Sequence, residues 1–321
     1  MRPPAGHWSD RPEGGGWFAL WLIRFIGLHF GRSVARSILY PVTLYFYFRR
    51  GPERRAARDY LLRIGGRPGN PWQVMHLIHA FAATILDRVF LLARGTRGFA
   101  ITVGGTDALK RHLERGRGVL LVGAHVGSFD VLRAAAAQHP RYRLKLVMDK
   151  QKTPALNALL EALAPELADC VIDTARGGTD VVLALAEAAR EGAMVALLGD
   201  RGRPQEQMRS VPFLGGEAAF PAAPWLIAAL LEVPVVLCLG MYRGGNRYDL
   251  VFETLAERVV LPRGDRDAAL DAHIARYASR LEHHLRASPY NWFNFYDFWQ
   301  PATPAAVPSP LAAPLERARA A

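Results

Sequence analysis

Short apolar segments alternate with longer amphipathic segments along most of this chain, and this alternation restricts its fold more than any other feature. The short segments have the composition of buried strands, and the longer ones carry apolar residues at helical spacing. Strands are predicted at 119–122, 144–148, 171–172, 194–198, 233–239 and 248–252, and helices at 71–92, 106–115, 129–138, 154–163, 178–191, 222–231 and 266–286. This order predicts an α/β fold, with a mostly parallel central sheet and helices on both faces.

The chain has 321 residues, half of them hydrophobic, which is enough for one large α/β domain with additional segments. We expect a basic N-terminal segment over 1–64, the α/β domain over 65–300 and a tail over 301–321. The tail is rich in Pro and Ala and is predicted to be disordered.

The N-terminal segment combines positive charge with aromatic and aliphatic residues. Residues 1–64 contain eleven arginines against four carboxylates, within a net charge of +11 for the chain. Apolar runs at 17–23, 25–28 and 37–48 are interrupted by Arg24 and Arg32, so none reaches the length of a simple spanning helix. This pattern predicts two amphipathic helices at a membrane interface. A single span from about residue 17 to 47 and a helical hairpin packed on the body remain open, whereas nucleic-acid binding is disfavoured.

The charges that follow these apolar runs indicate the side of the membrane. Arginines crowd residues 49–63, and the positive-inside rule therefore favours a cytoplasmic body. Residues 1–16 are polar and contain three prolines, which fits a cleavable signal peptide poorly. Cys170 and Cys238 are predicted to be reduced core residues, as expected in the cytoplasm.

A histidine at the end of a predicted strand is the main catalytic candidate. The strand at 119–122 leads into His125, and Asp130 follows five residues later, at the start of a predicted helix. A neutral imidazole accepts a proton from a hydroxyl when a carboxylate orients its other nitrogen. We therefore predict His125 as general base and Asp130 as its orienting carboxylate. Alternatively, Asp130 is only a favourable charge in a first helical turn and His125 an ordinary loop residue.

Candidate substrate-binding residues follow three other predicted strands or lie in the loop after them. They are Arg176 and Gly177, then Asp200, Arg201 and Arg203, and finally Phe213 and Gly215 in an apolar loop over 211–225. The arginines are suited to phosphate or to developing negative charge, and the glycines allow close approach of the backbone. The simpler alternatives are an exposed loop arginine, a solvated turn and ordinary packing.

The sequence has no nucleophilic-serine elbow, no phosphate-binding glycine loop and no Cys/His set at metal-ligand spacing. We therefore expect neither a cofactor nor a metal, and chemistry that depends on a base acting on bound substrates.

Taken in order, these motifs resemble the lysophospholipid acyltransferase superfamily, and within it the bacterial lipid A late acyltransferases. The likeness rests on the amphipathic N-terminus, His125 with Asp130, the Arg-Gly-Gly block at Arg176, the strand ending in Asp200, and Val-Pro-Phe-Leu-Gly over 211–215. Two departures stand out. Asp200-Arg201 replaces the usual Asp-Gln, and the aromatic ending at 289–299 looks like family members found with aryl polyene pathways. That ending is equally explained as a packed C-terminal lid.

The resemblance implies acyl transfer from a thioester of acyl carrier protein or coenzyme A to a hydroxyl of a membrane lipid or glycolipid, at the cytoplasmic face of a bacterial inner membrane. The protein is expected to be peripheral, monotopic or anchored by a single span. His125 removes the hydroxyl proton and Asp130 orients the ring. Arg176 and backbone amides near Gly127 are expected to stabilise the oxyanion. Phosphate of the acceptor or carrier is expected at Arg201, Arg203 or Arg209.

Two other functions remain open at this stage. One is a non-catalytic lipid-binding or scaffold protein of the same fold. The other is a thioester or lipid hydrolase, in which water replaces the acceptor hydroxyl. The apolar, aromatic surroundings favour a dry pocket over water attack.

Overall fold

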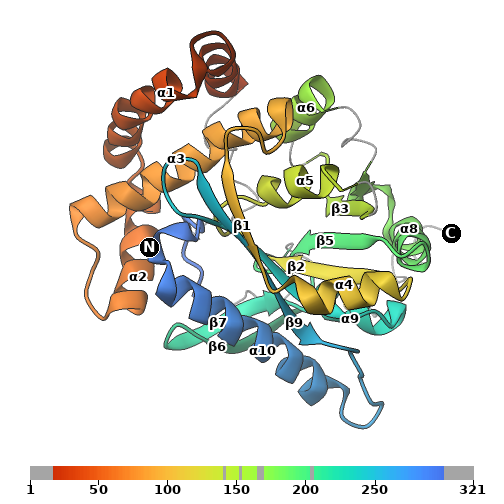
Figure 1. Cartoon of the computed structure of the whole chain (residues 1–321). Helices are drawn as coiled ribbons and strands as arrows, with labels where there is room; N and C mark the ends of the chain where they lie inside the picture. The colour runs from red at the N-terminus through yellow and green to blue at the C-terminus, as the bar shows by residue number, and fades with distance from the viewer. Residues whose placement is uncertain (1–16, 140–141, 152–153, 165–169, 203–205, 300–321) are drawn as a thin grey trace, which may run out of the picture.

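The computed structural model describes residues 17–139, 142–151, 154–164, 170–202 and 206–299 of the chain (Figure 1). The predicted tail at 301–321 and Arg203 lie outside these ranges.

A seven-stranded sheet forms the centre of the described structure (Figure 1). In spatial order its strands are β1 (Ala100–Gly104), β9 (Arg247–Ala256), β8 (Val235–Tyr242), β2 (Val119–Gly123), β5 (Met194–Leu198), β3 (Leu144–Met148) and β4 (Val171–Asp173). All neighbours pair in parallel except β8 and β9, which are antiparallel. The mostly parallel sheet confirms the predicted α/β fold.

Helices lie on both faces of the sheet. The described helices are α1 (Trp17–Arg49), α2 (Gly51–Gly65), α3 (Pro71–Arg94), α4 (Thr106–Glu114), α5 (Asp130–Ala137), α6 (Pro154–Leu163), α8 (Gly178–Arg190), α9 (Ala223–Leu231) and α10 (Arg266–Ala287), with short 3-10 turns η2 (Thr174–Arg176) and η3 (Pro289–Asn291). Of these, α1 and α2 pack on α3. Alternate residues of β2 serve the two faces. Leu121 packs in a cluster with Leu109 of α4 and Leu132 of α5. Leu120 belongs to the larger core, which includes Leu185 of α8.

The segment expected to be an apolar loop forms a β-hairpin instead. Strands β6 (Met208–Phe213) and β7 (Gly216–Pro221) pair in antiparallel register through a turn at Leu214 and Gly215. Both turn residues have positive φ, 50° and 72°, as a tight hairpin turn requires. The prolines in this segment argue against strands when the sequence is considered alone. The structure accommodates them because both strands of a two-stranded ribbon are edge strands, where proline is tolerated.

Strand β1 was also not predicted. It lies at the edge of the sheet and is mostly exposed, so it lacks the apolar run that marked the central strands.

Helix α1 packs one face on the body and leaves an aromatic face in solvent. The helix is interrupted at Gly31, whose φ of 82° and ψ of 169° are not helical. After this break, Leu39 and Tyr47 are buried, whereas Tyr40 and Phe48 are each 69% exposed. The alternative of a helix packed on the body therefore agrees with one side of α1. The opposite side is exposed and available to contact a membrane interface.

A buried carboxylate joins α1 to the body. Asp87 of α3 is fully buried and accepts two hydrogen bonds from Arg32, at 2.7 and 2.9 Å. The Tyr248 hydroxyl of β9 donates to the same carboxylate at 2.8 Å. Since a buried carboxylate requires charged or hydrogen-bonding partners, this cluster fixes the second half of α1 against α3 and the sheet.

Helix α3 is, within the described ranges, the one helix long and apolar enough to cross a membrane, and 61% of its apolar window is buried inside the protein. Its N-terminus carries a capping box formed by Asn70 and Gln73. In Figure 1 it runs along the edge of the body beside α1.

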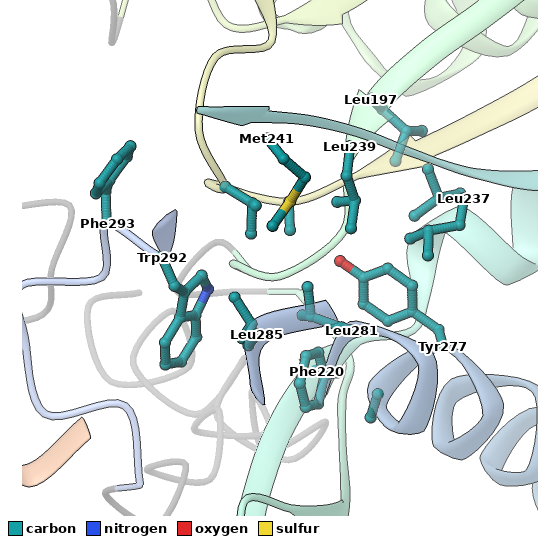
Figure 2. Packing of buried hydrophobic residues seen from close by; sticks show 14 of the residues in the cluster. Leu197, Phe220, Leu237, Leu239, Met241, Tyr277, Leu281, Leu285, Trp292 and Phe293 are labelled. Carbon is teal, nitrogen blue, oxygen red and sulfur yellow. The ribbon is translucent and has the colours of Figure 1, made fainter. Parts of the chain in front are cut away.

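The aromatic segment at 289–299 packs at one end of the sheet. Figure 2 shows Tyr277, Leu281 and Leu285 of α10 packed near Leu239 of β8, with Trp292 beyond them. The Trp292 ring is nearly inaccessible and contacts further aromatic rings at centroid distances of 4.7–5.8 Å. The packed-lid alternative for this ending therefore agrees with the structure.

Candidate functional site

Two neighbouring parallel strands bring a histidine and a carboxylate together. Gly123 of β2 and Leu198 of β5 are partners in register, and each strand is followed two residues later by a polar side chain. These side chains are His125 and Asp200, and His125 Nδ1 lies 2.7 Å from Asp200 Oδ1. The carboxyl ends of adjacent parallel strands are where open α/β sheets place their ligands.

Asp200 is fully buried, and hydrogen-bond donors surround its second oxygen. Oδ2 accepts from the backbone N–H of His125 at 3.1 Å, from Trp292 Nε1 at 3.2 Å and from Asn294 Nδ2 at 3.0 Å. Burial by itself would raise the pKa of this carboxyl. The charge and hydrogen bonds of His125, with the charge of Arg201, outweigh it and hold the pKa below its ordinary value. Asp200 is therefore an anion at neutral pH.

His125 is held as a neutral ring with one nitrogen available as a base. Burial lowers its pKa below 6.5, the charge of Arg201 lowers it further, and Asp200 works in the opposite direction. Because a carboxylate only accepts hydrogen bonds, the Nδ1 that faces it carries the proton, and Nε2 keeps its lone pair. The side chain retains 29% exposure, so the ring is reachable from outside. This geometry is suited to general-base chemistry.

The prediction that Asp130 orients His125 is wrong in this structure. Asp130 opens α5 and is buried, with its Oδ2 2.6 Å from Arg88 Nε of α3 and its other oxygen paired with Arg133. The carboxylate at His125 Nδ1 is Asp200. The five-residue spacing places Asp130 on the far side of a loop and in a different ion-pair cluster, so its role here is to join α5 to α3.

The loop after β2 is threaded closely against β8. A Cβ at Gly127 would lie 2.0 Å from the carbonyl oxygen of Gly240, and φ at Gly127 is +54°. Only glycine fits this approach. The Gly127 N–H donates to Asn291 O at 2.7 Å and the Ser128 N–H to Gly240 O at 2.8 Å.

The prediction that backbone amides near Gly127 stabilise the oxyanion does not agree with the structure, because these amides already donate hydrogen bonds within the protein. The N–H groups of residues 125–128 all donate to acceptors within the protein. A donor with an internal partner is not available to a substrate oxygen.

Arg201 is tied to the C-terminal segment. Its Nε donates to Asn294 Oδ1 at 2.5 Å, and a terminal nitrogen donates to Phe293 O at 2.9 Å. The guanidinium also lies 5.6 Å from the centroid of the Tyr296 ring. Arg201 thus belongs to the surroundings of Asp200.

The remaining candidate residues lie in several places. Phe213 is buried and packs against the ring of Trp292 at 5.4 Å, and Gly215 forms the hairpin turn. Arg209 pairs with Asp271 at 2.6 Å, on the exposed side of α10. Arg176 ends η2, and Gly177 precedes α8 with a φ of 108°.

No local sequence pattern places Trp292 and Asn294 beside the histidine. The signal is the aromatic run at 289–299, which by itself predicts a lid or a lipid contact. The run reaches the site because Val126 forms a β-bridge with Trp292, and the Phe293 N–H donates to His125 O at 2.9 Å.

The fold and the site together define an α/β protein with a partly exposed histidine, paired with a buried carboxylate, at the carboxyl end of a mostly parallel sheet. The family model for bacterial lipid A biosynthesis acyltransferases matches residues 76–300. The chain belongs to this family, and its membership supports an acyltransferase that uses an acyl donor and a lipid acceptor. A search of curated proteins gave no match.

Proposed function

We propose that this protein transfers an acyl group from a thioester to a hydroxyl of a membrane lipid, with His125 as general base and Asp200 as its orienting carboxylate. The observation that carries the proposal is the 2.7 Å contact between His125 Nδ1 and a fully buried Asp200, with the ring still partly exposed. Family membership supports the acyl transfer itself.

The reaction balances with these two residues and two substrates. As the acceptor oxygen attacks the thioester carbonyl, its proton moves to His125 Nε2 and a C–O bond forms. The C–S bond then breaks, and the imidazolium returns the proton to the departing thiolate. Asp200 stabilises the positive ring between these steps, without taking the proton itself. The products are an ester and a free thiol, and no acyl-enzyme forms.

The donor is proposed to be acyl carrier protein or acyl-coenzyme A. The chain's net charge of +11 is complementary to an acidic carrier protein, and it also suits the phosphates of coenzyme A. A labelled acyl group supplied on each carrier, with membranes from cells deleted for this gene as acceptor, tests both donors in one assay.

The His125→Ala variant tests the general base. We expect acyl transfer into lipid to fall by about 10²–10⁴-fold, since this is the usual contribution of general acid–base catalysis. Label in a new lipid supports a transferase, whereas label released as free fatty acid identifies the hydrolase alternative. Lipid binding without thioester consumption in the wild type identifies the scaffold alternative. Full activity of His125→Ala would refute the proposed mechanism.

We further propose that the exposed face of α1 lies on the cytoplasmic surface of the membrane. Tyr40, Leu44, Tyr45 and Phe48 are exposed together, and the last three border a shallow, open surface depression with Arg49. Aromatic side chains favour the headgroup region, and arginines pair with anionic lipids. The arginines at 49–63 lie at the end of this face and in α2.

A flotation assay tests this surface. We expect a Tyr40→Ser/Tyr45→Ser/Phe48→Ser variant to lose binding to vesicles containing phosphatidylglycerol. The matched control is Leu183→Ser, which removes a comparably exposed side chain from α8, and it should bind as the wild type does. Retained binding of the triple variant would refute α1 as the contact face.

A further inference from the structure

The amide of Asn294 lies between an arginine and the carboxylate that holds His125. Asn294 is buried, its Nδ2 donates to Asp200 Oδ2 at 3.0 Å, and its Oδ1 accepts from Arg201 Nε at 2.5 Å. It comes from the aromatic run at 289–299, far from β2 and β5 in the sequence.

The direction of this amide is determined by its two neighbours. Asp200 only accepts hydrogen bonds, and a guanidinium only donates them. A flipped Asn294 would set an oxygen against the carboxylate and an NH₂ group against Arg201, so both hydrogen bonds would be lost. The hydrogen-bonded series Arg201–Asn294–Asp200 therefore has a single arrangement in which the amide makes hydrogen bonds to both neighbours.

We propose that Asn294 is a positioning residue for the acyl transfer: it holds Oδ2 of Asp200 so that Oδ1 faces His125 Nδ1, and it links the charge of Arg201 to that carboxylate. This inference rests on the proposed function. Trp292 Nε1 supplies a second side-chain donor to the same oxygen, at 3.2 Å. With Oδ2 held on this side, the rotation that would turn Oδ1 away from His125 breaks several hydrogen bonds.

Asn291 provides a matched control within the same segment. It is equally buried, but within the described part of the chain its side chain bonds only the backbone of Tyr242, accepting from N at 2.7 Å and donating to O at 3.1 Å. An apolar replacement there removes a buried amide without touching Asp200. A purely structural role for Asn294 predicts that the two asparagines behave alike.

The charged and titratable groups around the pair determine the expected direction of change. Arg201 and Arg88 act on His125, and Tyr277 and Tyr296 lie close enough to Asp200 to interact with its charge. Removing the Asn294 donor leaves Asp200 less compensated, so the pair binds its proton more tightly and the acid limb of the rate profile moves to higher pH. In Asn294→Asp a second carboxylate beside Asp200 moves the limb further in the same direction.

The experiment compares Asn294→Leu, Asn294→Asp and Asn291→Leu with the wild type. We expect kcat of Asn294→Leu to fall by about 10–100-fold with little change in KM, the range that the loss of one hydrogen bond to a charged group corresponds to. Asn291→Leu should lower the unfolding temperature but leave the acid limb in place. Unchanged limbs in both Asn294 variants would overturn the proposal.

A measurement independent of activity separates this inference from the proposed function. NMR of protein with ¹⁵N-labelled histidine reports the tautomer and pKa of His125, assigned by its absence in His125→Ala. The proposal expects Nδ1–H in the wild type and a raised His125 pKa in Asn294→Asp. An identical titration in wild type and Asn294→Asp would overturn it. Full activity of His125→Ala would instead refute the proposed function.

Discussion

Replacing Asp200 by asparagine tests the central geometry, because the change keeps the shape of the side chain, removes its negative charge and puts an NH₂ donor in place of one acceptor oxygen. Among the described residues, the Oδ2 position faces three donors, from His125 N–H, Trp292 and Asn294, whereas Oδ1 faces only His125 Nδ1. The NH₂ group of the new asparagine is therefore expected at the Oδ1 position, where it meets fewer competing donors than at the Oδ2 position. There it donates to Nδ1, so the ring proton moves to Nε2 and the basic lone pair is lost from the substrate side.

The expected loss follows from this change of tautomer. A triad aspartate replaced by asparagine, with the same consequence for its histidine, costs about 10⁴-fold in kcat. That factor corresponds to about 5 kcal/mol of activation free energy. Because the His125 ring stays in place and only its tautomer changes, KM should change little.

Asp130→Asn is the matched comparison. This carboxylate is also buried, but it pairs with Arg88 and Arg133. Breaking a buried ion pair costs about 3–5 kcal/mol of stability when a charge is left uncompensated. We therefore expect the unfolding temperature to fall more in Asp130→Asn than in Asp200→Asn, and kcat of the folded protein to fall less.

The assay is single-turnover transfer of a labelled acyl group into membrane lipid, measured beside thermal unfolding of the same preparations. An Asp200→Asn variant with wild-type kcat would refute the assignment of Asp200. A larger kcat loss in Asp130→Asn than in Asp200→Asn would return the orienting role to Asp130.

Three further outcomes follow from the structure. Since burial lowers the pKa of His125, kcat/KM should stay high at neutral pH and fall only as the pH drops through a midpoint below 6.5. A midpoint above 6.5 would contradict the buried neutral ring. Gly127→Ala should lose activity and about 1–3 kcal/mol of stability or more, because of the positive φ and the contact with Gly240 O. A urea unfolding curve like that of the wild type would show that the loop relaxes to accept the methyl group. Asp87→Ala should cost about 3 kcal/mol because Arg32 and Arg36 lose their carboxylate partner, and an unchanged urea midpoint would mean that α1 is not held by this cluster.

Much of the fold was predictable because strand and helix periodicities are local. The strand at 144–148 and the helix at 154–163 agree with the structure at both ends. The hairpin at Met208–Pro221 was missed because its strands contain prolines and its pairing is visible only across the turn.

Within the site, the sequence identified both partners of the pair but joined the wrong two. The strand pattern marks His125 and Asp200 each as a polar residue after a strand, whereas nearness in sequence favours Asp130 as the orienting group. Asn294 is not predictable in this way, since nothing local in an aromatic run marks one amide as a partner of a carboxylate more than 90 residues earlier.

The sequence by itself determined the elements, the α/β class and the candidate base, because these depend on composition and spacing over one turn or one strand. Tertiary structure decided which carboxylate reaches His125. The pairing of β2 with β5 brings Asp200 to the ring, and the bridge between Val126 and Trp292 brings in Asn294. Strand order and bridge partners arise from packing across the whole sheet, and local periodicity contains no information about either.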